Sequence, residues 1–273
     1  MKRALILSGG GMSCSYAVGV LSALIKEYKL TSPELIIAGS GNSGIAAYYV
    51  ANQYPQMIRV WTSTIVTKKF INYLRFWKIV DVDYLIDWIF KKEMPLNIKK
   101  VRNSKTLLLL PVTNYDTGKV EYLSNKSQVD LLEALRAAEA VPIVYRKIIE
   151  IMGKRYVDTK LSADPHIGIL KALELGATQL IVIDCRNPSR WVYYCFRTWL
   201  AYQSKKFKKN YFAKFKRIQS IKIPKKVKMV VLKPKKLKTS IFCQNLILLN
   251  EMISQGYEDV CQNNELKQLL RPK

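Results

Sequence analysis

Two serines lie among glycines in "IAGSGNSGIAAYYVA", residues 37–51. A hydrophobic run ends there, and a run rich in alanine and tyrosine, typical of a helix, follows. A sharp strand-to-helix turn can expose a serine hydroxyl as a nucleophile, provided that small flanking residues let the strained backbone pack closely against its neighbours. The segment therefore predicts a turn in which Ser40 or Ser43 performs nucleophilic chemistry.

The small residues of the turn favour Ser43 as the nucleophile. Gly41, Asn42 and Gly44 surround it, so that Ser43 lies at the expected crest of the turn with the helix following. We expect these three neighbours to form the nucleophile elbow. Ser40 comes before the turn and is expected to shape the backbone instead.

A nucleophilic serine needs a general base within hydrogen-bond reach. The only histidine of the chain is His166. Ser43, Asp158 and His166 follow the chain order of α/β-hydrolase triads, but such a nucleophile normally follows several strands rather than the second. We therefore expect His166 to start a helix or to lie at the surface. Asp158, at the end of the short strand in "KRYVDT", is expected to act directly as the base, whereas Asp164 is expected to be a turn residue.

A second glycine turn, "SGGGMSCSY" at residues 8–16, lies between an apolar run and a helical pattern. Three consecutive glycines, Gly9, Gly10 and Gly11, let backbone N–H groups converge at a helix N-terminus, where they can bind an anion. A dinucleotide fingerprint is excluded because Cys14 stands at its last glycine position, and a P-loop is excluded because no lysine follows.

The order of the elements indicates the fold class. A strand, a glycine turn and a helix occur twice within the first 55 residues, which is typical of a parallel α/β sheet. We expect one α/β domain over residues 1–273, with a central, mainly parallel sheet and helices on both faces. The expected strands lie within residues 3–10, 33–40, 106–124, 154–159, 178–186 and 228–234, and the expected helices within 15–30, 44–54, 131–142, 166–176 and 240–270.

The formal net charge of +25 predicts attraction to an anionic partner. Residues 205–238 hold fifteen Lys and Arg and no Asp or Glu, with aromatic residues between the charges in "KKFKKNYFAKFKR". This basic segment is either a solvated face or a patch that meets anionic lipid, with its aromatic side chains at the headgroup level. Nucleic acid is the weaker alternative because no nucleic-acid-binding motif accompanies the charge.

The five cysteines form no CxxC pair, which fits a reducing compartment better than a disulfide framework or a zinc site. The N-terminal apolar run is too short for a signal peptide, and no run of about 18 apolar residues could span a bilayer. We expect a cytoplasmic protein that associates peripherally with membranes and needs no metal or other cofactor.

Taken together, these segments resemble the patatin-like phospholipases, in particular compact bacterial single-domain members. "LILSGGGMSCSYAVGVLSAL" resembles the oxyanion segment of that family, and "GSGNSGIAA" resembles its elbow. "VTNYDTGKVEYL", "LRAAEAVPIVY", "RYVDTKLSADP" and "ALELGATQLIVID" follow in the order and spacing of the family, so the resemblance covers roughly residues 1–190. It implies a three-layer α/β/α patatin-like fold.

The resemblance also implies a serine lipid acyl hydrolase of the phospholipase A or lysophospholipase type. Ser43 would attack a lipid ester carbonyl and Asp158 would take its proton. The backbone N–H groups of Gly9, Gly10 and Gly11 would hold the oxyanion, and no metal would be required. The alternative is a degenerate member of the family that binds lipid or anionic membrane without turnover.

Several positions depart from the family pattern. Ser13 and Cys14 replace the basic residue and the last glycine of the oxyanion turn, and Ile45 ends the elbow where a glycine is expected. The D-G-G motif has become Asp158-Thr159-Lys160, and neither Thr159 nor Lys160 can copy the backbone freedom of glycine.

Seven aromatic residues are candidates for lining an acyl groove, although they are equally consistent with ordinary core packing. They are Tyr48, Tyr49, Trp61, Phe76, Trp77, Trp88 and Phe90.

Overall fold

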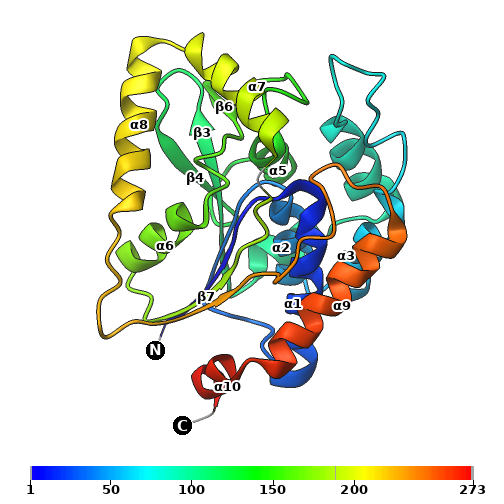
Figure 1. Ribbon diagram of the computed structural model, residues 1–273, viewed down its shortest axis with the longest axis vertical. Coiled ribbons are helices and arrows are strands. Elements are labelled where there is room, and N and C mark those ends of the chain that lie inside the picture. The colour runs from blue at the N-terminus through cyan, green and yellow to red at the C-terminus, as the bar shows by residue number, and fades with distance from the viewer. Residues whose placement is uncertain (1, 188, 272–273) are drawn as a thin grey trace.

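The computed structural model describes residues 2–187 and 189–271. Within these residues eight strands form one mixed sheet, with the path β5-β6-β3-β2-β1-β7-β8 and with β4 paired to β3. Helices pack on both faces of the sheet (Figure 1), which gives the expected three-layer α/β/α architecture. The strands are β1 (Arg3–Leu7), β2 (Leu35–Ala38), β3 (Leu107–Asn114), β4 (Val120–Ser124), β5 (Ile149–Ile151), β6 (Lys154–Val157), β7 (Gln179–Ile183) and β8 (Lys228–Leu232).

Three short segments wind differently from an α-helix: a 3₁₀ turn η1 (Gly11–Cys14) and two π-helical segments, η2 (Val60–Thr64) and η3 (Tyr84–Glu93). The α-helices are α1 (Ser15–Tyr28), α2 (Asn42–Val50), α3 (Tyr54–Arg59), α4 (Ile98–Asn103), α5 (Leu131–Glu139), α6 (Pro165–Glu174), α7 (Arg190–Ala201), α8 (Lys205–Gln219), α9 (Leu246–Gln262) and α10 (Asn264–Leu270).

The central strands are buried on both faces, as expected for parallel strands covered by helices. Alternate residues of β1 show this division. Leu5 and Leu7 belong to the large core shared with α1, α2, α5 and α9, whereas Ala4 and Ile6 pack on the opposite side with Ile169 of α6. Strands β1, β2, β3, β7 and β8 run parallel, and β4 and β6 pair antiparallel with β3.

Residues 205–238 do not form one continuous basic surface. They include the helix α8 and the strand β8, which pairs with β7 at the edge of the sheet. Two of the four aromatic residues of α8 point inward, since Phe207 and Tyr211 are buried in a cluster with Phe196. The composition of the segment predicted neither α8 nor its packing against the core. Charged residues occur at nearly every second position, so no apolar helical face is evident in the sequence.

Helices α1 and α9 cross in close backbone contact on one face of the sheet. A Cβ atom on Gly19 would lie 1.8 Å from the carbonyl oxygen of Ile253, and one on Gly256 would lie 2.2 Å from that of Tyr16. The lack of side chains at these two positions therefore sets the spacing of the helices. No helix among residues 2–187 and 189–271 is long and apolar enough to cross a membrane.

We predict that Gly256→Ala destabilises the protein. Alanine favours a helix over glycine by about 1 kcal/mol, but the clash with Tyr16 forces the helices apart, and we expect a net loss of about 1–3 kcal/mol in the free energy of unfolding. Urea unfolding measures this loss. Ser254→Ala, at an exposed position of the same helix, is the control and should have little effect. A Gly256→Ala protein as stable as the wild type would contradict the close helix crossing.

Candidate active site

The three central strands β1, β2 and β7 end at the same level of the sheet. Leu7 of β1 is in register with Ala38 of β2 and with Ile183 of β7. The residues that follow these strands therefore meet at one edge of the sheet, which is where α/β proteins bind ligands. Both glycine turns identified in the sequence emerge at this edge.

Ser40 occupies the sharp turn between β2 and α2. Its φ angle is 52°, which is an uncommon conformation for a residue with a side chain. The turn is tightly enclosed: a Cβ atom on Gly9 would lie 2.8 Å from the Cβ atom of Ser40, and one on Gly39 would lie 3.0 Å from the carbonyl oxygen of Ser162. Helix α2 begins at Asn42, so Ser40 stands just before its N-terminus. In elbow enzymes the nucleophilic serine occupies a strained strand-to-helix position of this kind.

Ser43 lies one turn further along, inside α2. It is fully buried, and its hydroxyl donates a hydrogen bond of 2.8 Å to Oε1 of Glu139. Ser40 contributes to the wall of the neighbouring cavity, whereas Ser43 does not. The three expected elbow residues differ in location. Gly41 and Gly44 line the cavity, whereas Asn42 is buried in the first turn of α2.

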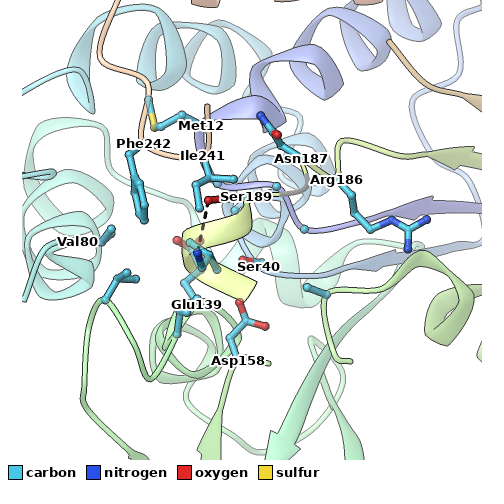
Figure 2. Close-up of a pocket in the computed structure, with 18 of the residues that line it drawn as sticks. Met12, Ser40, Val80, Glu139, Asp158, Arg186, Asn187, Ser189, Ile241 and Phe242 are labelled. Carbon is cyan, nitrogen blue, oxygen red and sulfur yellow. Dashed lines mark hydrogen bonds between the residues drawn. The ribbon is translucent and has the colours of Figure 1, made fainter. Parts of the chain in front are cut away.

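Asp158 directly follows β6, which pairs antiparallel with the last residues of β3. This pairing places the Asp158 side chain at the edge of the sheet where the parallel strands end. The side chain is 2% exposed, and Oδ1 accepts a hydrogen bond of 3.0 Å from the Ser162 hydroxyl. Figure 2 shows the Asp158 carboxyl next to Ser40. Burial raises the pKa of Asp158 to about 7, although hydrogen bonds from Ser40 and Ser162 favour the ionised form and oppose the shift.

Glu139 is a second carboxyl in the same wall of the cavity. Its Oε1 atom accepts a hydrogen bond from Ser43, and the residue, which is only partly buried, lines the cavity. Burial of the carboxyl raises the pKa of Glu139 to about 8, and the nearby charge of Asp158 acts in the same direction. Near neutral pH the Glu139 carboxyl is therefore mostly protonated, while Asp158 is about half ionised.

The triple-glycine turn supplies backbone N–H groups beside Ser40. The N–H of Gly9 donates to the carbonyl oxygen of Ala163 at 2.8 Å and is already occupied. Within the described part of the chain, the N–H groups of Gly10, Gly11 and Gly41 have no hydrogen-bond acceptor. All three residues line the cavity, where N–H groups without a partner can bind an oxyanion.

These groups lie in a cavity of about 680 Å³. Figure 2 shows Ser40, Glu139 and Asp158 on one side of it and the apolar side chains of Val80, Ile241 and Phe242 on another. The greater part of the wall is aliphatic or aromatic, as is usual for sites that bind apolar ligands. The apolar lining residues include Val60, Trp61, Ile65, Phe70, Ile71, Val80, Val82, Leu85, Phe90, Val141, Ile143, Val144 and Phe196.

The candidate groove aromatics separate into three groups. Trp61 and Phe90 line the cavity. Tyr48 and Tyr49 are fully buried in the core, with their hydroxyls bonded to backbone carbonyl groups. The remaining residues, Phe76, Trp77 and Trp88, are exposed.

Within the described residues, the His166 side chain is hydrogen-bonded to Asp164 and not to Ser40 or Asp158. Its Nδ1 atom is 2.7 Å from Oδ1 of Asp164, its side chain is 45% exposed, and it does not line the cavity. Asp164 caps the N-terminus of α6 and also binds Arg186 at 2.7 Å. His166 lies in the first turn of a helix, as expected, whereas Asp164, expected to be a turn residue, is the cap of that helix.

The positions that depart from the family pattern have local partners. Thr159 and Thr113 share a hydrogen bond of 2.8 Å, and Lys160 is exposed with its ammonium 5.4 Å from the centre of the Tyr193 ring. Ser13 is hydrogen-bonded to Thr239. Both Thr159 and Lys160 also line the cavity.

Sequence reasoning set Ser40 aside in favour of Ser43 and did not name Glu139. Ser40 could have been chosen by position, because it comes two residues after the strand ends, whereas Ser43 already falls within the helix. Glu139 had a weaker signal: it is an acidic residue on the alanine-rich stretch before Pro142, where the helix turns its apolar face inward.

Comparison with known proteins identifies the family of the chain. The family model for patatin-like phospholipases matches residues 5–176. The uncharacterized protein YjjU of Escherichia coli K12 is 24% identical over 200 residues, which cover 71% of this chain and 54% of YjjU. The chain thus spans about half the length of this curated relative.

The fold has a counterpart among solved structures. The crystal structure of VipD from Legionella pneumophila superposes with a TM-score of 0.60 at 12% identity, covering 98% of this chain and 66% of that one. The likeness to VipD shows a shared fold, and the family match extends over more than half of the sequence. The chain belongs to the patatin-like phospholipase family.

Proposed function

We propose that this protein hydrolyses acyl esters of phospholipids or related lipids, with Ser40 as the nucleophile and Asp158 as the general base. One observation carries the proposal: Ser40, held at a φ of 52°, lies beside the buried Asp158 carboxyl in the wall of an apolar cavity. Ser43, the nucleophile expected from the sequence, is directed to Glu139 instead.

In the first half of the reaction, the Ser40 hydroxyl oxygen attacks the ester carbonyl carbon and its proton passes to the Asp158 carboxylate. The carbonyl oxygen becomes an oxyanion. When the tetrahedral intermediate collapses, the bond to the leaving alcohol breaks, and that alcohol takes the proton from Asp158. The acyl group is left as an ester on Ser40.

In the second half, Asp158 takes a proton from water as the water attacks the acyl-Ser40 carbonyl. Collapse returns the proton to the Ser40 oxygen and releases a carboxylic acid. One carboxyl thus serves as base and as acid in both halves of the reaction, and no histidine is needed.

The N–H groups of Gly10, Gly11 and Gly41 are our candidates for the oxyanion hole. Gly41 directly follows Ser40, and the residue after the nucleophile supplies one oxyanion donor in elbow enzymes. Gly9 was expected to be a donor, but its N–H is bonded to Ala163; we assign it the role of allowing close approach to Ser40. Loss of one such donor typically slows the reaction by about 100- to 1,000-fold.

A lipid substrate is favoured by the apolar wall. An acyl chain removes apolar surface from water as it enters the cavity, at about 0.8 kcal/mol for each buried CH₂ group. Cationic side chains at the polar end, Lys160, Arg190 and Lys233, are exposed and suit a phosphate-bearing headgroup. The basic residues of 205–238 would add long-range attraction to an anionic membrane.

We predict that Ser40→Ala abolishes ester hydrolysis, whereas Ser43→Ala keeps a substantial part of it. Removing the nucleophile lowers kcat by about 10⁴-fold or more, while Ser43→Ala only removes a hydrogen bond to Glu139. Turnover of a water-soluble chromogenic ester measures both, with circular dichroism as the control for folding. Loss of activity in Ser43→Ala together with retention in Ser40→Ala would overturn the assignment. A folded wild type without any hydrolysis would favour a lipid-binding protein.

We predict that kcat/KM rises with pH and levels off above about 7, because Asp158 must be ionised to take the proton and its pKa is raised to about 7. Below that value the rate should fall about tenfold for each pH unit. Asp158→Asn should remove both the activity and this profile. A rate that stays constant from about pH 5 to about pH 8 would argue against Asp158 as the base.

We predict that Glu139→Gln flattens the dependence of stability on pH. The carboxyl has a pKa of about 8 in the folded protein, against about 4.3 in an unfolded chain. Between these values the native state holds a proton that the unfolded state releases, so that stability falls as pH rises, by about 1.4 kcal/mol per pH unit for one proton. Above about 8 the loss is complete.

Urea unfolding at several pH values tests this prediction. Glu139→Gln should gain stability over the wild type as the pH is raised, while Glu150→Gln, at an exposed position, should follow the wild type. Parallel curves for Glu139→Gln and the wild type would show that the Glu139 carboxyl is not held protonated.

A further inference from the structure

Large hydrophobic side chains are exposed beside the cavity. The turn at 72–78 exposes Leu74 by 86%, Phe76 by 68% and Trp77 by 54%, and α7 exposes Trp191 by 50%. We call the group of Tyr73, Leu74, Phe76, Trp77, Trp191 and Tyr194 the entrance rim. Such a concentration of exposed apolar groups marks an interaction surface rather than ordinary solvent-facing residues.

The two halves of the entrance rim belong to one surface. The ring of Phe242 lies 5.9 Å from that of Tyr73 and 6.1 Å from that of Trp191, measured between ring centres. Phe242 also lines the main cavity, and Tyr73 and Trp191 line a smaller hollow of about 320 Å³ next to it. Figure 1 shows α7 and the cyan 72–78 turn at the same end of the molecule. The rim therefore borders the opening of the cavity.

Charge identifies the partner that this surface fits. Residues 64–80 and 186–202 contain no Asp or Glu. Lys68 and Lys69 are exposed in the first stretch, and Arg190 and Arg197 in the second. Exposed aromatic residues among cations, without acids, match the headgroup region of an anionic bilayer, where aromatic rings lie at the interface and cations meet lipid phosphates.

The basic helix α8 lacks this combination. Phe207 and Tyr211 face the interior, and of its aromatic residues only Phe212 has a largely exposed side chain, 53% of its surface. Figure 1 also shows α8 along the side of the molecule, away from the 72–78 turn. Helix α8 can contribute positive charge, but the apolar groups able to enter a bilayer are at the entrance rim.

We propose that the entrance rim is the docking surface for a lipid bilayer with anionic headgroups. Insertion of Leu74, Phe76 and Trp77 would bring the cavity opening against the lipid surface, so that an acyl chain passes from one apolar environment into another. The idea that docking delivers substrate to the cavity rests on the proposed hydrolase function. Docking itself does not require turnover, so the two can be tested separately.

The main test measures binding of the full-length Ser40→Ala protein to vesicles by co-sedimentation. The vesicles contain phosphatidylcholine alone or an equal mixture of phosphatidylcholine and phosphatidylserine. In that background, Leu74→Ser/Phe76→Ser/Trp77→Ser removes the apolar rim, and Met152→Ser/Val231→Ser removes two exposed apolar groups elsewhere. A variant with serine at Lys205, Lys206, Lys208 and Lys209 removes charge from α8.

We expect the rim variant to bind mixed vesicles about tenfold or more weakly, and the Met152/Val231 control to bind as the parent does. Binding should be weaker on phosphatidylcholine alone and should decrease with salt. The proposal is overturned if the rim variant binds as well as its parent, or if only the α8 variant loses binding. The same rim substitutions, placed in active protein, should leave turnover of a water-soluble ester unchanged, which verifies the fold and keeps docking separate from catalysis.

Fluorescence gives an independent measurement. Brominated lipids quench tryptophan that enters the bilayer, so Trp77→Phe should remove more of the quenched signal than Trp88→Phe. Trp88 is 45% exposed but its indole nitrogen is bonded to Glu93, which does not suit an anionic surface. Equal effects of the two substitutions would contradict insertion of the 72–78 turn.

Discussion

The positive φ angle of Ser40 is the constraint on which the rest of the site depends. A residue with a side chain adopts this conformation only when its surroundings enforce it. Here Gly9 and Gly39 have no side chains, so neighbouring chain segments pack closely against the turn. Gly41 lies between Ser40 and the start of α2, and its N–H has no hydrogen-bond acceptor within the described residues. In the proposed mechanism, the turn that positions the Ser40 hydroxyl therefore also leaves a backbone donor for the oxyanion.

Burial governs the chemistry of the two carboxyls. Asp158 and Glu139 are enclosed by the same apolar wall, and both have pKa values raised by desolvation, to about 7 and about 8. Asp158 lies beside Ser40 and has the lower pKa of the two, whereas Glu139 accepts a hydrogen bond from Ser43 in the first turn of α2. An apolar cavity thus suits the proposed lipid chain and at the same time gives the proposed base, Asp158, a pKa near neutral pH.

The sequence predicted the parallel sheet, the helices on both faces and the location of Asp158, because strand and helix patterns and glycine turns are local signals. It favoured Ser43 over Ser40, whereas we propose Ser40 as the nucleophile; the choice depends on where β2 ends, within three residues. The inward packing of Phe207 and Tyr211 was equally hidden, because lysines cover the exposed side of α8. The contact between Tyr73, Trp191 and Phe242 joins segments far apart in the chain, and no local pattern reports such a contact.

Identifying the serine that forms the covalent adduct tests the central claim most directly. A fluorophosphonate reacts with an activated serine, and trypsin cleavage leaves Ser40 and Ser43 on one peptide that fragmentation mass spectrometry can divide between them. We predict that the added mass appears on Ser40, and that Asp158→Asn prevents its attachment. An adduct on Ser43 would contradict the account, because it would require the hydroxyl now bonded to Glu139 to be the reactive one.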